Sequence, residues 1–159
     1  MVELLRLEVV GGPTQPAWWS RGWLGAVRPS LVLAGVNYFA WPFAALVASG
    51  GVAEAGFNIS RVCLMVWAGF AVVRKGASGL LGAGFAGIAI LVVDHIALKG
   101  GGFLLEYARG KQIEQLGPHS YLMAFGGVVA SFIMFSPVAA GAGLCGGMLG
   151  RSNEVRDAA

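Results

Sequence analysis

The sequence predicts an all-α integral membrane protein, a bundle of about four transmembrane helices. Of its 159 residues, 57% are hydrophobic and only 12% are charged. A soluble domain has about 25% charged residues, so this chain has too few to coat a surface that faces water. The 26 glycines lie mostly in apolar runs. Glycine is costly in a soluble helix but lets helices approach closely in lipid, which favours a membrane protein.

One run, residues 78–98, carries the clearest signal. It is about as long as a helix needs to be to cross the ~30 Å hydrocarbon core of a bilayer. Its first half consists of small residues, its second half is bulky and aliphatic, and Asp94 and His95 come near its end. We expect a transmembrane helix here.

Three further apolar runs predict spans at residues 31–48, 57–73 and 121–149, so that residues 31–150 form one transmembrane domain. Pro42 should kink the first of these helices. The last run is longer than the bilayer requires, so it must tilt, kink at Pro137 or leave the membrane early. Residues 99–119 form the longest polar connection, in which Phe103 to Leu116 could fold as a short surface helix.

The two ends of the chain are more polar. We expect residues 1–30 to be an interfacial segment and residues 151–159 to be a cytoplasmic tail. Tryptophan and arginine both find partners among lipid headgroups. The predicted interfacial anchors are Trp18, Trp19, Arg21, Trp23 and Arg28.

The distribution of basic residues predicts the orientation. Cytoplasmic segments are enriched in Lys and Arg, and most of the basic residues fall in segments on the same side as the N-terminus: Arg6, Arg21, Arg28, Arg74, Lys75, Arg151 and Arg156. The opposite segments contain Lys99, Arg109 and Lys111, with Arg61 at the boundary. Both termini are therefore expected in the cytoplasm, and the protein in the cytoplasmic membrane. The net charge of +3 reflects this pattern and not nucleic-acid binding.

A polar network is expected inside the membrane. In this topology Arg61, Asp94 and His95 lie at similar depth, about one turn inside the outer boundary. Because a charge in lipid needs a partner or water, we predict that Arg61 and Asp94 pair between helices. The pair could only fix the helix register, or it could belong to a proton or ion relay with His95.

Other chemistry finds little support in the sequence. His95 and His119 could be axial ligands to a haem, but there is no CxxCH attachment signal. Catalytic motifs, metal-ligand spacing and phosphate-binding loops are missing as well, and Cys63 and Cys145 look like small core residues. We expect no enzyme, no metal and no cofactor.

Lateral association is the remaining prediction. Small residues at helical spacing provide smooth faces for van der Waals contact between helices. The predicted helix-packing residues are Gly79, Ala83, Gly87, Gly143, Gly146, Gly147 and Gly150. There are more such faces than one small bundle needs, which favours a homo-oligomer in the lipid bilayer.

The entry to the first span resembles a known family. Trp19-Ser20-Arg21, followed by Val27-Arg28-Pro29-Ser30, is similar to the start of the small phage and gene-transfer-agent holins, and Ala68-Gly69-Phe70 before Arg74-Lys75 is similar to the end of a later helix in them. The resemblance covers about residues 18–75. It implies a lysis protein that gathers in the cytoplasmic membrane and opens a pore. Two alternatives stay open: a non-catalytic accessory subunit of a larger membrane complex, and a small channel or transporter.

Overall fold

A computed structural model of the chain describes residues 21–111, 117 and 119–157. Every element in this part of the chain is a helix, so the all-α prediction is confirmed for it. The elements in order are α2 (Arg21–Val47), α3 (Gly50–Arg74), α4 (Leu80–Leu91), η1 (Val92–Gly100), α5 (Gly101–Ala108) and α6 (Ser120–Asp157).

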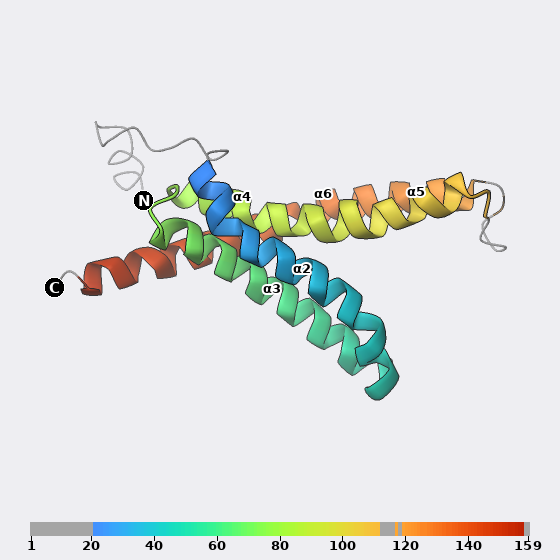
Figure 1. Ribbon diagram of the computed structural model, residues 1–159, viewed down its shortest axis with the longest axis horizontal. Helices are drawn as coiled ribbons and strands as arrows, with labels where there is room; N and C mark the ends of the chain where they lie inside the picture. Colours follow the sequence, from blue (N-terminus) through green and yellow to red (C-terminus); the bar gives the residue numbers. More distant parts are fainter. Residues whose placement is uncertain (1–20, 112–116, 118, 158–159) are drawn as a thin grey trace.

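The helices form two antiparallel hairpins that diverge like the arms of a V (Figure 1). One arm is α2 with α3, and the other is the continuous rod α4–η1–α5 with α6. At the closed end of the V, α2 and α4 begin, α3 ends, and the C-terminal part of α6 passes by. The α2–α3 turn lies at one tip of the open end, and the end of α5 and the start of α6 lie at the other.

Three helices of the described chain are long and apolar enough to cross a membrane. They are Gly51–Arg74, Leu80–Ala108 and Ser120–Ser152. The first predicted span, 31–48, falls almost entirely within α2. This helix continues through Pro29 and Pro42 without interruption.

The two arms meet at a crossing built on glycine. A methyl group added to Gly143 of α6 would collide with the carbonyl of Ala83 in α4, and one added to Gly69 of α3 would collide with the carbonyl of Gly143. A methyl group added to Gly146 would likewise collide with the carbonyl of Val66. Backbones can approach this closely only where side chains are absent, so these glycines fix where α6 lies between α3 and α4.

The third helix differs from the prediction at its end. The polar connection was expected to begin at Lys99, but the rod continues through Gly100 to Ala108. The reason is packing against α6: a Cβ atom on Gly100 would lie 2.9 Å from the ring of Phe125. This contact with a neighbouring helix outweighs the low helix propensity of glycine. The helix instead stops before Gly110, whose φ is +70°.

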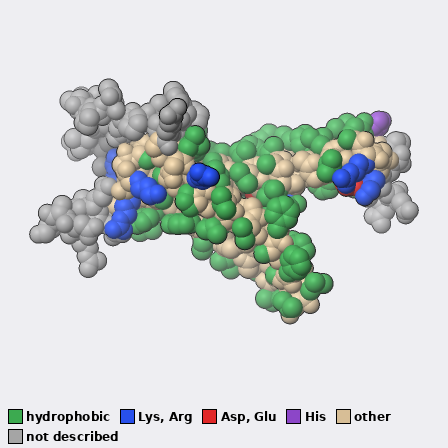
Figure 2. Space-filling model, viewed as in Figure 1, with side chains coloured by type: hydrophobic (Ala, Val, Ile, Leu, Met, Phe, Trp, Pro, Cys, Tyr) green, Lys and Arg blue, Asp and Glu red, His purple; other side chains and the backbone are tan. Residues whose placement is uncertain are grey.

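The surface is apolar along both arms and basic at the ends. Figure 2 shows hydrophobic side chains over most of the two arms, with Lys and Arg gathered near the closed end and at the tip of the α5 arm. Large apolar side chains are exposed on α2, α3 and α6, for example Phe43, Ile59 and Ile133. This distribution suits a chain whose middle faces hydrocarbon and whose ends face water.

Candidate functional site

A buried ionic cluster joins α3 to η1. The Arg61 guanidinium donates from Nη2 to Asp94 Oδ2 at 2.7 Å, and Nη2 also lies 2.9 Å from His95 Nδ1. The third side of this triangle, from His95 Nδ1 to Asp94 Oδ2, is 3.0 Å. The structure thus brings together all three residues of the polar network predicted from the sequence.

The cluster bridges a gap between separated backbones. Within the described residues, no Cα atom of α3 lies within 8 Å of a Cα atom of η1. The long side chain of Arg61 spans that distance. Asp94 is 1% exposed and His95 is 5% exposed, while 12% of the Arg61 side chain is exposed. The carboxylate of Asp94 is therefore held inside the protein, and the Arg61 side chain reaches it from a partly exposed position on α3.

Two atoms of this ion pair lack a hydrogen-bond partner among the described residues. Asp94 Oδ1 and Arg61 Nε are both buried and unbonded. Arg61 also has weaker contacts on its own helix, because its guanidinium lies 5.4 Å from the centre of the Phe57 ring and Nη1 is 3.4 Å from Asn58 Oδ1. These contacts and the ion pair with Asp94 hold the guanidinium at the same time.

The backbone that carries Asp94 and His95 is a π-helix, η1, over Val92–Gly100. Such wide turns are rare and occur frequently at functional sites. Sequence reasoning missed this feature. Periodicity cannot reveal it, since the change in helical hydrogen bonding leaves no mark on composition.

A second polar contact joins α2 to α3. The single proton of the Ser60 hydroxyl has two acceptors within reach, Asn37 Oδ1 at 2.9 Å and the carbonyl of Phe57 at 2.8 Å. Ser60 lies beside Arg61 in α3, so Asn58, Ser60 and Arg61 fall within one turn of this helix. An amide in an apolar run that binds a neighbouring helix contributes about 1 kcal/mol to helix association.

Most of the predicted packing residues lie at the glycine crossing. Gly87, Gly143, Gly146 and Gly147 have no room for a Cβ atom, and Gly150 is tightly packed against Phe70 and Val73. Ala83 is buried beneath Gly143 and Gly147. Gly79 has a different position, because it precedes α4 as its N-terminal cap.

The predicted interfacial anchors are only partly within the described residues. Trp18 and Trp19 lie outside them, Arg21 is the first residue of α2, and Arg28 is exposed. Trp23 differs from the prediction. It is 6% exposed, and its indole N–H donates to the carbonyl of Gly82 at 2.9 Å. The indole finds its acceptor on α4 and is packed between helices instead of among headgroups.

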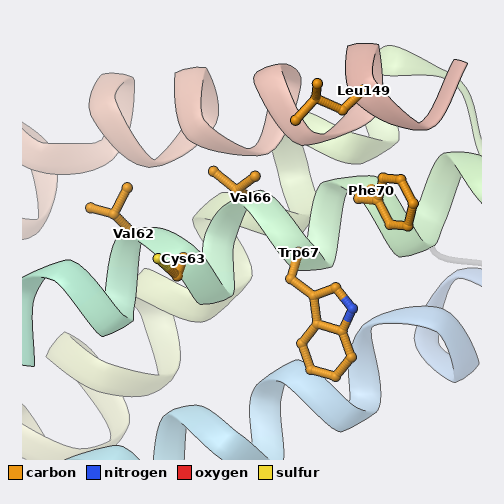
Figure 3. A pocket seen from close by; sticks show the side chains of 6 residues that line it. All are labelled: Val62, Cys63, Val66, Trp67, Phe70 and Leu149. Atoms are coloured by element: carbon orange, nitrogen blue, oxygen red, sulfur yellow. The ribbon is translucent and has the colours of Figure 1, made fainter. Parts of the chain in front are cut away.

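The cysteines correct another expectation. Cys63 and Cys145 are free and exposed, so they are not core residues. Cys63 lines a groove of about 330 Å³ on the outside of α3, together with apolar side chains: Val62, Val66, Trp67, Phe70 and Leu149. Figure 3 shows Leu149 reaching over from α6, while Trp67 points towards α2. A groove this apolar suits hydrocarbon chains or another helix.

The histidines do not share a site. His95 belongs to the ionic cluster and lies 6.3 Å from the ring of Phe135 in α6. His119 is exposed and bonds to the hydroxyl of Tyr107. Within the described residues there is no group of three His, Cys, Asp or Glu side chains that could hold a metal ion.

Comparison with known proteins finds no relative. The chain matches no protein-family model, and no curated protein or solved structure is similar to it. The class is therefore defined by the fold alone: the described part of the chain is all-helical, and three of its helices are long and apolar enough to span a membrane.

Proposed function

We propose that the chain is a multi-pass protein of the cytoplasmic membrane that associates with copies of itself and permeabilises the bilayer, as holins do. In this proposal α2 supplies a fourth span, and both termini lie in the cytoplasm. The closed end of the V then faces the cytoplasm with Arg28, Arg74 and Lys75, in agreement with the positive-inside pattern.

One observation carries the proposal: the apolar faces that the two arms leave uncovered. The large side chains exposed on α6 include Met123, Ile133, Met134, Val138 and Met148. In lipid, such faces are free to meet the same faces of neighbouring copies. Because the two arms diverge, each hairpin also has a separate side surface that can contact neighbouring copies in the membrane.

The buried ionic cluster of the described residues suits a structural role. It consists of an arginine, an aspartate and a histidine that bond to one another and so link two helices. The motifs at the entry to α2 that resemble holins point the same way. A lysis protein needs a helical bundle that oligomerises, and little soluble mass.

Induced expression in a bacterial host tests the proposal. We expect growth to stop abruptly with loss of membrane potential, measured with a potential-sensitive dye. A thiol crosslinker should give a ladder of oligomers through the exposed Cys63 and Cys145. The variant Cys63→Ser/Cys145→Ser is the matched control, which should still abolish the potential but give no ladder. Harmless expression together with co-purification of another membrane protein would contradict the proposal and favour an accessory subunit.

A second candidate is a small channel or transporter, favoured by the buried cluster on a π-helix. Ionisable side chains inside a membrane commonly mark a substrate or ion path. On this alternative Asp94→Asn would abolish a specific flux in proteoliposomes while the oligomer still assembles. Under the holin proposal the same variant keeps the abrupt loss of potential.

A further inference from the structure

Two largely apolar grooves lie side by side on the outside of α3. The first, of about 330 Å³, is bounded by α6, and the second, of about 490 Å³, is bounded by α2 through side chains such as Leu33. Two polar side chains of the second groove, Asn37 and Ser60, lie at the end nearer the α2–α3 turn and are hydrogen-bonded to each other. Cys63 and Trp67 line both grooves, so they form the ridge between them.

This ridge leads to a cation. Arg74 follows Cys63 by eleven residues and Trp67 by seven, which at about 3.6 residues per turn places all three on one face of α3. The guanidinium of Arg74 lies 5.6 Å from the centre of the Phe70 ring, and Phe70 lines the first groove. Because α3 ends at Arg74, this cation lies where both grooves reach the closed end of the V (Figure 1).

We propose that this surface binds one anionic phospholipid, with its two acyl chains in the two grooves and its phosphate on Arg74. The inference rests on one part of the proposed function, that α3 crosses the membrane. From Cys63 to Arg74 the helix rises about 16 Å, close to half of the ~30 Å hydrocarbon core. The grooves therefore fit within one leaflet, with Arg74 at the level of the headgroups.

Charge decides which lipid fits. A guanidinium presents a planar fork of N–H donors that matches phosphate oxygens. A zwitterionic phospholipid also has a phosphate, but it places an ammonium group near Arg74, and an anionic headgroup has no such cation. The anionic lipid is therefore the better partner.

The same charge argues against a second copy of the chain as the occupant. An apolar helix could cover the grooves, but it would need an acidic group to meet Arg74. Neither α2 nor residues 120–150 of α6 contain Asp or Glu. The long apolar faces that a second copy offers on these helices thus lack the complement of this cation.

The fluorescence of Trp67 tests the inference in the full chain, reconstituted in lipid nanodiscs. Phenylalanine replaces the other four tryptophans, Trp18, Trp19, Trp23 and Trp41. Two nanodisc samples contain the same mixture of phosphatidylglycerol and phosphatidylcholine. They differ only in which lipid has brominated acyl chains, because bromine quenches tryptophan on contact. The ratio of quenching gives the relative affinity of the grooves for the two lipids.

We expect phosphatidylglycerol to be preferred about fivefold, which corresponds to about 1 kcal/mol for one cation near an anionic headgroup. Arg74→Gln should reduce the ratio to about one. Lys75→Gln is the matched control and should keep the preference, because Lys75 lies about 100° further around the helix. Equal quenching in the parent, or a preference that survives Arg74→Gln, overturns the inference. Equal losses in the Arg74 and Lys75 variants overturn it as well, since they would indicate general surface charge.

A second pair of variants tests the groove without changing any charge. Val62→Phe fills part of the first groove and should lower the preference towards one, whereas Ile59→Phe, about one turn away and outside both grooves, should not. Equal effects of the two variants overturn the inference. If neither brominated lipid quenches Trp67, protein covers the grooves and a second copy is the occupant. No readout here depends on permeabilisation, so the lipid preference and the loss of membrane potential can fail separately.

Discussion

Arg61 and Asp94 are joined by a 2.7 Å ion pair across two helices whose Cα atoms are all more than 8 Å apart. The pair therefore links α3 and η1 without any backbone contact between them. Because Asp94 lies in the π-helix η1, the pair ties this helix to α3 at the opening of the V.

Removing one partner of the pair should be strongly destabilising. Asp94→Ala leaves the Arg61 charge without its buried partner, a loss of about 3–5 kcal/mol. The double variant Arg61→Met/Asp94→Leu removes both charges and should recover most of that loss. Unfolding in a mixed-micelle SDS titration measures the difference. Equal destabilisation of the single and double variants would show that charge pairing is not the cause.

Exchanging the two charges tests the same pairing by rescue. We expect Arg61→Asp/Asp94→Arg to restore part of the stability lost by Asp94→Ala and Arg61→Ala separately. The geometry will not be ideal, because arginine on η1 must reach in the opposite direction. A swap that restores nothing would contradict the pairing.

The glycine crossing predicts a sharp contrast within one helix. Gly143→Ala places a methyl group against the carbonyl of Ala83 and should push α6 away from α4, whereas Gly141→Ala meets nothing within 4 Å. The control substitution should be neutral or stabilise the helix by up to about 1 kcal/mol. SDS-titration midpoints of the two variants measure this. Equal midpoints for the two variants would contradict the close approach of α6 to α4.

Trp23 should behave as a buried packing residue. Trp23→Phe keeps an aromatic ring but removes the hydrogen bond to Gly82, with an expected loss of about 1 kcal/mol. Trp67→Phe, at a half-exposed position on α3, is the matched control and should cost less. Tryptophan fluorescence adds a second readout, because a lipid-soluble quencher should reach Trp67 more readily than Trp23.

The exposed cysteines should react selectively with lipid-soluble thiol reagents. Cys63 and Cys145 are both exposed, and Cys63 lies among apolar side chains on the outside of α3. If these surfaces face hydrocarbon, a lipid-soluble maleimide should label both residues in native membranes, and a charged maleimide should label neither. Mass spectrometry of the modified chain gives the result. Equal labelling by the charged reagent would mean that the surfaces face water.

Much of the fold could be predicted from the sequence, because long apolar helices have a strong composition signal. The all-helical class, the long apolar helices and the small-residue faces follow from the low charge and the glycine-rich runs. The approach of Arg61 to Asp94 and His95 could be predicted as well. In antiparallel neighbouring helices, residues at the same distance from the connected ends lie side by side.

Features that depend on tertiary contact could not be predicted. The continuation of the rod beyond Lys99 depends on Phe125 filling the space beside Gly100, some twenty-five residues away in sequence. Trp23 was expected at the membrane surface because tryptophan beside arginine is typical there, but its acceptor is a carbonyl on α4. The divergence of the two arms and the π-helix leave no periodic signal.

The most direct test of the central claim, that these helices cross the cytoplasmic membrane with both termini inside, is cysteine labelling of intact cells. In the Cys63→Ser/Cys145→Ser background, single cysteines at Glu54, Ala108 and Ser152 are treated with a membrane-impermeant maleimide. If the helices cross in this orientation, Glu54→Cys and Ala108→Cys are labelled from outside, and Ser152→Cys is labelled only after the membrane is opened. Labelling of Ser152→Cys in intact cells, or recovery of the chain in the detergent-free soluble fraction, would contradict it.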